Sequence, residues 1–202
     1  MTQDSSWRGF ASDNYAGIHP DVLEAIERAN TGHDVAYGDD VITERLRDAV
    51  KDHFGAKAQV FPVFNGTGAN VVALQAMTRR WEAVVCSTTA HVNVDEGGAP
   101  EHGAGLKLWT VPTPDGKLTP GLIDTQAWGF GDVHRAQPGA VTITQSTELG
   151  TLYTVEEVAA ITEHAHSMRM GVHLDGARIS NAAAALGTGL GDFTTHAGVD
   201  AV

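Results

Sequence analysis

From residue 60 onward, the chain alternates between short apolar runs and segments with the apolar spacing of helices. Parallel strands are joined by helical crossovers, so this order predicts an α/β fold: a mainly parallel sheet with helices on both faces, in three layers. The strand-like runs lie at 60–64, 83–86, 106–111, 140–144 and 171–175, and residues 198–202 resemble the first half of another strand.

The segment before this alternation has a different pattern. Residues 1–19 are rich in turn formers and predict an irregular N-terminal arm. Pro20 is expected to start a helix, because proline fits the first helical turn, and a second helix is expected to end near Gly55. No linker composition or internal repeat separates the parts, so residues 1–202 are interpreted as one piece of a single large domain.

Charge and composition exclude several classes of function. The 202 residues carry a net charge of −12 and no cluster of Lys or Arg, which argues against nucleic-acid binding. No apolar run approaches the roughly 18 residues of a membrane span, and the polar start does not resemble a signal peptide. Cys86 is the only cysteine and is expected to be buried. The expected protein is therefore cytoplasmic, with a small-molecule ligand.

Residues 171–178 predict a buried strand that meets a glycine turn and then a helix rich in small residues. Asp175 and Arg178 would lie at the carboxyl end of that strand, where open α/β sheets bind ligands. Asp175 has two interpretations at this point. It caps the following helix, or it holds a cationic ligand atom.

Residues 65–70 also follow a strand-like run and open a helix. Gly66 and Gly68 permit close approach of the backbone, and Thr67 adds a hydroxyl, which suits a phosphate at a helix N-terminus. The spacing is neither that of a P-loop nor that of a dinucleotide fingerprint. A plain glycine turn before a helix remains the alternative.

His91 follows the strand-like run at 83–86, which places it at the same edge of the sheet. Such a histidine can stack on an aromatic ligand, act as a base or bond to a loop carbonyl. The acidic pairs at 39–40 and 95–96 have no histidine at a recognisable ligand spacing, so no metal is expected. A phosphorylated ring with a protonated nitrogen would use the glycine loop, His91, Asp175 and Arg178 together, and pyridoxal phosphate is such a cofactor.

With these motifs in order, the sequence resembles the low-specificity L-threonine aldolase family. These are pyridoxal-phosphate-dependent lyases with the aspartate-aminotransferase-like fold. The resemblance runs from Phe10 to Val202. Its motifs are residues 11–14, 36–40, 65–70, 90–91, 145–151 and 173–178.

The resemblance implies a role for each matching residue of the cofactor site. Gly66 and Thr67 would bind the cofactor phosphate, and His91 would stack on the ring and serve as a base or its helper. Asp175 would pair with the ring nitrogen. Arg178 would contact the ring hydroxyl and the substrate carboxylate.

The resemblance also implies substrate contacts and an assembly. Ser12 would touch the substrate carboxylate, and Tyr37 would reach the active site near a subunit interface. Glu148 stands where some members of the family have a second active-site histidine, so its role is open. The family implies a homotetramer that is a dimer of dimers.

One family feature is missing from these residues. The lysine that bonds covalently to the cofactor would follow Val202, as would a small C-terminal domain, and the last lysine here is Lys117. The expectation is thus a truncated chain, inactive alone, from an enzyme that cleaves L-threonine or L-allo-threonine to glycine and acetaldehyde. Two alternatives stay open: a β-eliminating or phenylserine-cleaving lyase of the same fold, and an inactive truncated subunit.

Overall fold

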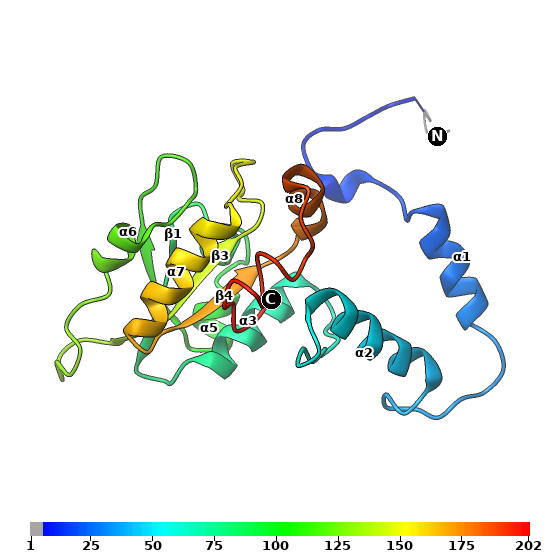
Figure 1. The fold of residues 1–202 in the computed structure, drawn as a ribbon, viewed down its shortest axis with the longest axis horizontal. Helices are drawn as coiled ribbons and strands as arrows, with labels where there is room; N and C mark the ends of the chain where they lie inside the picture. The colour runs from blue at the N-terminus through cyan, green and yellow to red at the C-terminus, as the bar shows by residue number, and fades with distance from the viewer. Residues whose placement is uncertain (1–5) are drawn as a thin grey trace. The chain divides into compact units, whose positions relative to one another are not determined.

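The computed structural model describes residues 6–202. The chain forms two compact units, Met1–Leu46 and Arg47–Val202. In the first, a 3-10 turn at Asp13–Tyr15 precedes helix α1 (Pro20–Ala29), which has proline at its start as the sequence predicts. Helix α2 (Val41–Phe54) begins in the first unit and ends in the second (Figure 1).

The second unit contains a parallel sheet of four strands, as the alternation predicts. Its order is β2 (Lys107–Val111), β1 (Glu82–Ser87), β3 (Gln137–Thr144) and β4 (Gly171–Asp175). All three pairings are parallel. The carboxyl ends of β1, β3 and β4 therefore reach the same edge of the sheet, which is where α/β folds bind their ligands.

Helices cover both faces of this sheet, which gives the predicted three layers (Figure 1). One core packs α6 and α7 against side chains such as Val85 and Val141. The other packs α3 and α4 against Val84 and Ala140. The alternate direction of neighbouring strand residues separates the two cores. The helices are α3 (Gly66–Met77), α4 (His91–Val94), α5 (Ala99–Gly103), α6 (Pro120–Asp124), α7 (Val155–Ser167) and α8 (Ile179–Leu186).

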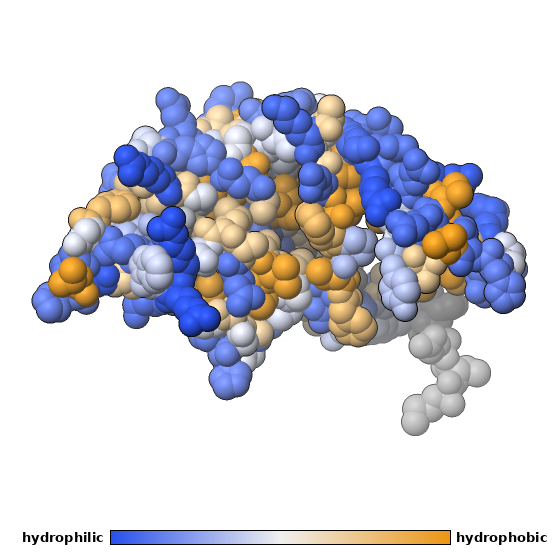
Figure 2. Space-filling model, turned by 90° about the horizontal axis from the view of Figure 1, so that it is seen from below, coloured by the Kyte–Doolittle hydropathy of each residue, from blue (hydrophilic) through white to orange (hydrophobic). Residues whose placement is uncertain are grey.

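The strand predicted at 60–64 is wrong: the structure has no strand between α2 and α3. A strand needs a neighbour for its backbone hydrogen bonds, and the described sheet supplies none to this run. Phe61 and Phe64 are 75% and 99% exposed. Residues 54–63, α3 and residues 199–202 line an apolar groove of about 930 Å³. The face in Figure 2 shows apolar patches that interrupt a mostly hydrophilic surface.

The half-strand expected at 198–202 is present as a short pairing with β4. The Asp200 N–H donates to the Val172 carbonyl at 2.9 Å, and the Leu174 N–H donates to the Ala201 carbonyl at 2.9 Å. Helix α6 ends at Asp124, and a turn follows it. Cys86 is buried in β1, as expected. Within residues 6–202, none of the helices combines the length and apolar character required to cross a membrane.

Candidate functional site

Asp175 ends β4 and is 8% exposed. Its Oδ1 accepts a hydrogen bond from the Ala177 N–H at 3.1 Å, which fixes the turn after the strand. Helix α8 has Arg178 as its N-cap residue, so Asp175 does not occupy the cap position. The second oxygen, Oδ2, faces α3 and accepts from the Asn70 side chain at 3.0 Å. The capping interpretation of Asp175 is therefore wrong, and the ligand interpretation stays a prediction.

Asn70 connects Asp175 to a second buried carboxylate. Its amide nitrogen donates to Glu96 Oε1 at 2.7 Å as well as to Asp175. The same Glu96 oxygen lies 2.9 Å from His91 Nδ1. Four side chains from α3, α4, the following loop and β4 thus form one hydrogen-bonded chain at the carboxyl edge of the sheet.

The uncharged amide of Asn70 joins the two carboxylates of this hydrogen-bonded network, Glu96 and Asp175. The Glu96 side chain is fully buried, and its Oε2 has no hydrogen-bond partner among the described residues. A buried carboxylate oxygen without a donor costs free energy. The Asn70 amide orients both carboxylates and carries no charge of its own, so it does not neutralise them.

His91 has a pKa above its ordinary value. Burial is the largest single influence and lowers it, but the hydrogen bond and charge of Glu96, together with the charges of Asp175 and Asp95, outweigh burial. The backbone N–H of His91 donates to Glu148 Oε1 at 3.2 Å. Both the ring and the main chain of His91 are therefore fixed by carboxylates.

Glu148 also pairs with Arg178, whose Nη2 lies 3.8 Å from Oε1 and donates to the Ser146 carbonyl at 3.4 Å. Burial raises the pKa of Glu148, and the hydrogen bonds and Arg178 only partly offset it. Glu148 thus links the loop after β3 to the start of α8. Its side chain orients the arginine that the sequence singles out.

The glycine loop begins α3. Asn65 is the N-cap, and its Oδ1 accepts from the Gly68 N–H at 2.8 Å. A side chain at Gly66 would meet nothing within 4 Å, so open space faces the backbone at the helix start. Because Asn70 on the same helix reaches Asp175, this N-terminus lies on the ligand edge of the sheet.

Residues 9–202 match the model of a family described as Beta-eliminating lyase. The chain belongs to the beta-eliminating lyase family. It is 45% identical over 201 residues to a low specificity L-threonine aldolase of Pseudomonas sp., covering 99% of this chain and 58% of the relative. It is 46% identical over 192 residues to one of Pseudomonas aeruginosa, covering 95% and 56%.

A threonine aldolase of Leishmania major superposes with a TM-score of 0.82 and 30% identity, covering 88% of this chain and 52% of that structure. A putative L-allo-threonine aldolase of Listeria monocytogenes, at a TM-score of 0.68 and 20% identity, shares the fold, covering 88% and 49%. The chain therefore spans about half the length of the relatives that it matches.

Of the residues predicted for the family's site, His91, Asp175 and Arg178 gather with the helix that carries Gly66 and Thr67. Ser12 and Tyr37 belong to the other unit, so their contact with a substrate stays a prediction. Ser12 Oγ accepts from the Asn14 N–H at 3.1 Å. Tyr37 has a positive φ of 66°.

Asn70 and Glu96 are the residues that sequence reasoning missed. His91 and Glu96 are five apart, and the Gly97-Gly98 pair after Glu96 has positive φ values of 59° and 76°. Oxygen and nitrogen atoms of His91, Glu96 and Asp175 all lie within 4.8 Å of one another. Sequence spacing did not show this proximity. The Asn70 amide donates to two of the three groups.

Lys117, the last lysine of the sequence, is engaged elsewhere. Its Nζ donates to both Glu157 carboxylate oxygens at 2.6 Å and to the Leu152 carbonyl at 2.9 Å. It also lies over the Tyr153 ring. These contacts join the loop after β2 to α7, which gives this lysine a structural role.

Proposed function

We propose that the full-length protein carrying this chain is a pyridoxal-phosphate-dependent aldehyde lyase. Its substrates would be β-hydroxy-α-amino acids, with L-threonine and L-allo-threonine cleaved to glycine and acetaldehyde. The observation that carries the proposal is the buried Asp175 carboxylate at the end of β4, fixed by Asn70 and placed in one network with His91. The 45–46% identity to relatives named low specificity L-threonine aldolase supports this choice of reaction.

The residues at this edge fit pyridoxal phosphate. Asp175 and Glu96 give this edge of the sheet negative charge, which suits a protonated ring nitrogen, and the start of α3 offers backbone donors with open space at Gly66. The cofactor, when bound, supplies an electron sink for the pair released by bond cleavage at Cα. The protein's part is to place and orient the reacting groups.

Each residue has a proposed task in this reaction. Gly66 and Thr67 bind the phosphate, and Asp175 keeps the ring nitrogen protonated. His91 stacks on the ring. Arg178 binds the ring hydroxyl and the substrate carboxylate, and Glu148 orients its guanidinium by the 3.8 Å pairing.

Cleavage needs a base at the β-hydroxyl group. His91 is the proposed base or its helper, since its raised pKa makes the neutral ring a stronger proton acceptor. The hydroxyl proton passes to the base, the Cα–Cβ bond breaks, and its electron pair stays on the Cα side. The β-carbon leaves as acetaldehyde, and protonation of Cα gives glycine. Ser12 and Tyr37 are proposed substrate contacts.

The test is product analysis with L-threonine and the full-length protein. We expect acetaldehyde and glycine in equal amounts, with release dependent on added cofactor. Aldehyde released without glycine, or no aldehyde from either threonine diastereomer, would contradict the proposal. Benzaldehyde from phenylserine as the favoured product would redefine the substrate.

A second candidate is β-elimination, favoured by the description of the matching family. It would convert L-threonine to 2-oxobutanoate and ammonia instead of an aldehyde. The two reactions differ in the bond broken, Cα–Cβ or Cβ–O, so one product assay separates them.

We also propose a cytoplasmic homotetramer that is a dimer of dimers. The low cysteine content supports the cytoplasmic location, and the family resemblance supports the assembly. Light scattering of the purified protein tests the assembly, and an intact mass near 21.3 kDa would identify a truncated product.

A further inference from the structure

The network around Asn70 contains two residues that have no proposed contact with the cofactor or the substrate. Asn70 and Glu96 are 5% and 7% exposed, which is unusual for an amide and a carboxylate that contact no substrate. Both side chains point at residues of the proposed reaction. The Asn70 amide reaches Asp175, and Glu96 Oε1 reaches His91 Nδ1.

The orientation of the Asn70 amide follows from its partners. Both contacts, at 2.7 Å and 3.0 Å, are to carboxylate oxygens, which only accept hydrogen bonds. The NH₂ group must therefore face them, because the reversed amide would place its own oxygen against two negative charges. Asn70 thus holds Glu96 and Asp175 side by side although like charges repel.

The tautomer of His91 follows in the same way. Nδ1 lies 2.9 Å from Glu96 Oε1, and a carboxylate only accepts. Nδ1 therefore carries the proton and donates a hydrogen bond to the carboxylate. In the neutral ring, Nε2 then has the lone pair. Glu96 cannot turn toward water, because its side chain is fully buried.

We propose that Asn70 and Glu96 are positioning residues: Glu96 fixes His91 with its proton on Nδ1 and Nε2 as the acceptor, and Asn70 holds Glu96 against Asp175. The inference rests on the proposed function for its catalytic meaning. Its geometric part concerns this chain's own residues and is testable without the reaction.

The first experiment reads His91 directly. Nitrogen chemical shifts of the purified protein labelled with 15N-histidine, assigned by a His91→Asn variant, report tautomer and pKa. Above its pKa, His91 should be protonated on Nδ1. The opposite tautomer in the wild-type protein would overturn the proposal without any variant.

Two variants should move the His91 pKa in opposite directions. Glu96→Gln removes the charge that favours the imidazolium, so the pKa should fall by about one unit or more. Asn70→Leu removes the dipole that partly compensates Glu96 and Asp175, so the pKa should rise. Asp95 and Glu148 remain in both variants as background charges. Shifts of the same sign, or none, would refute the assignment.

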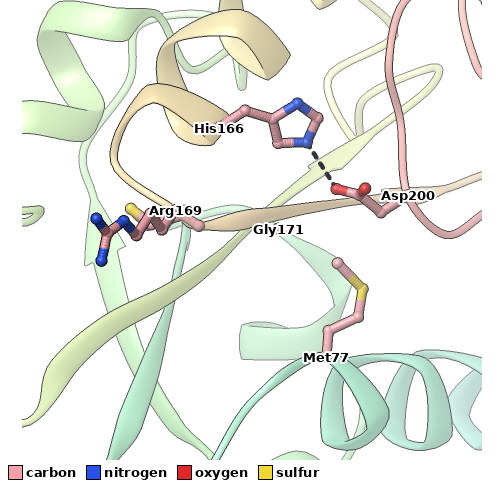
Figure 3. A pocket seen from close by; sticks show the side chains of 6 residues that line it. Met77, His166, Arg169, Gly171 and Asp200 are labelled. Atoms are coloured by element: carbon pink, nitrogen blue, oxygen red, sulfur yellow. Dashed lines mark hydrogen bonds and ion pairs between the residues drawn. The ribbon is translucent and has the colours of Figure 1, made fainter.

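A matched control exists at the other end of the sheet. His166 Nε2 lies 2.9 Å from Asp200 Oδ2, beside a shallow pocket where the two side chains face one another (Figure 3). Asp200→Asn also removes a carboxylate from a histidine but lies outside the network. It should leave both the His91 pKa and its tautomer unchanged. A change in the His91 pKa in this variant would show that the nitrogen shifts of His91 respond to distant charges as well as to Glu96.

The reaction supplies the second readout. If neutral His91 is the base, the acidic limb of the kcat profile should move to lower pH in Glu96→Gln, together with the measured pKa. A shifted pKa with an unmoved limb would exclude a role of Glu96 in positioning the base. A wild-type protein that releases no aldehyde would refute the proposed function, while the chemical shifts would still decide the network.

Discussion

Two histidine–carboxylate pairs lie at opposite ends of the sheet and share their local geometry. His91–Glu96 and His166–Asp200 both have a nitrogen–oxygen distance of 2.9 Å. The two histidine side chains are 40% and 43% exposed. The difference lies in the acids, because Glu96 is fully buried and Asp200 is 46% exposed.

This comparison shows that distance alone does not decide what such a pair does. Water screens the charge of Asp200, and exposed pairs contribute on the order of 0–1 kcal/mol. Glu96 is shielded from water and held by Asn70, so water screens its charge less than that of Asp200. Asp200 has a structural use instead, since it also accepts from the Val172 N–H at 2.8 Å and so joins residues 198–202 to β4.

The largest expected difference between the two ends is in catalysis. Asp175→Ala in the full-length protein should lower kcat by about 10²–10³-fold or more, the range for loss of one electrostatic contact to the reacting centre. Steady-state kinetics with L-threonine measures it, and circular dichroism verifies the fold. A nearly wild-type rate would contradict the role of Asp175.

His173 extends the comparison to a fully buried histidine. It lies in β4, with its Nδ1 2.8 Å from Thr142 Oγ1, and burial lowers its pKa to about 4. Between about pH 4 and 6.5, His173 is therefore neutral in the folded state and protonated in the unfolded chain. The contribution of His173 to the free energy of unfolding should be fully present above pH 6.5. It should fall by about 3 kcal/mol as the pH drops toward 4.

The measurement for His173 is urea denaturation at several pH values. His173→Asn should flatten the acid limb relative to the wild type, and this difference isolates His173 from His91, whose raised pKa acts in the opposite direction. Parallel curves for the two proteins would exclude the assignment.

Asn70→Leu should destabilise the fold by about 1–3 kcal/mol, because the substitution leaves buried carboxylate oxygens without their donor. Denaturant titration at neutral pH gives the value, and Asn70→Asp should cost more, since it adds a third negative charge. An unchanged midpoint for both variants would show that the amide bridge contributes nothing to stability.

The smallest effect is expected at the exposed pair. Asp200→Asn should change the free energy of unfolding by less than about 1 kcal/mol, because the asparagine oxygen can still accept from Val172. Its kcat should stay close to that of the wild type, because Asp200 lies outside the network around Asn70. A loss as large as that of Asn70→Leu would remove the distinction between the two ends.

Sequence reasoning reached the parts of the site that follow strands. Asp175 and His91 lie after apolar runs, and parallel strands bring such positions to one edge. Asn70 and Glu96 could not be reached this way, because a helix position and a loop position meet only through the packing of α3 on the sheet. The glycine pair after Glu96 is the one local signal that its chain turns inward.

The strand predicted at 60–64 failed for a different reason. Its composition favours a strand, but composition cannot supply the neighbouring backbone that a strand requires. The parallel pairing of the four strands could be predicted from the sequence, because their strand-like runs alternate with helices. Whether an isolated run pairs depends on what lies beside it in space.

That unpaired run has a consequence for the behaviour of the chain in solution. Phe61 and Phe64 place two aromatic rings in water beside the apolar groove. Exposed aromatic segments with free backbone groups invite association between molecules. Solubility of the isolated 202 residues should therefore be limited by this short segment and not by the stability of the sheet, and polar substitutions at these two rings should raise the concentration at which it precipitates.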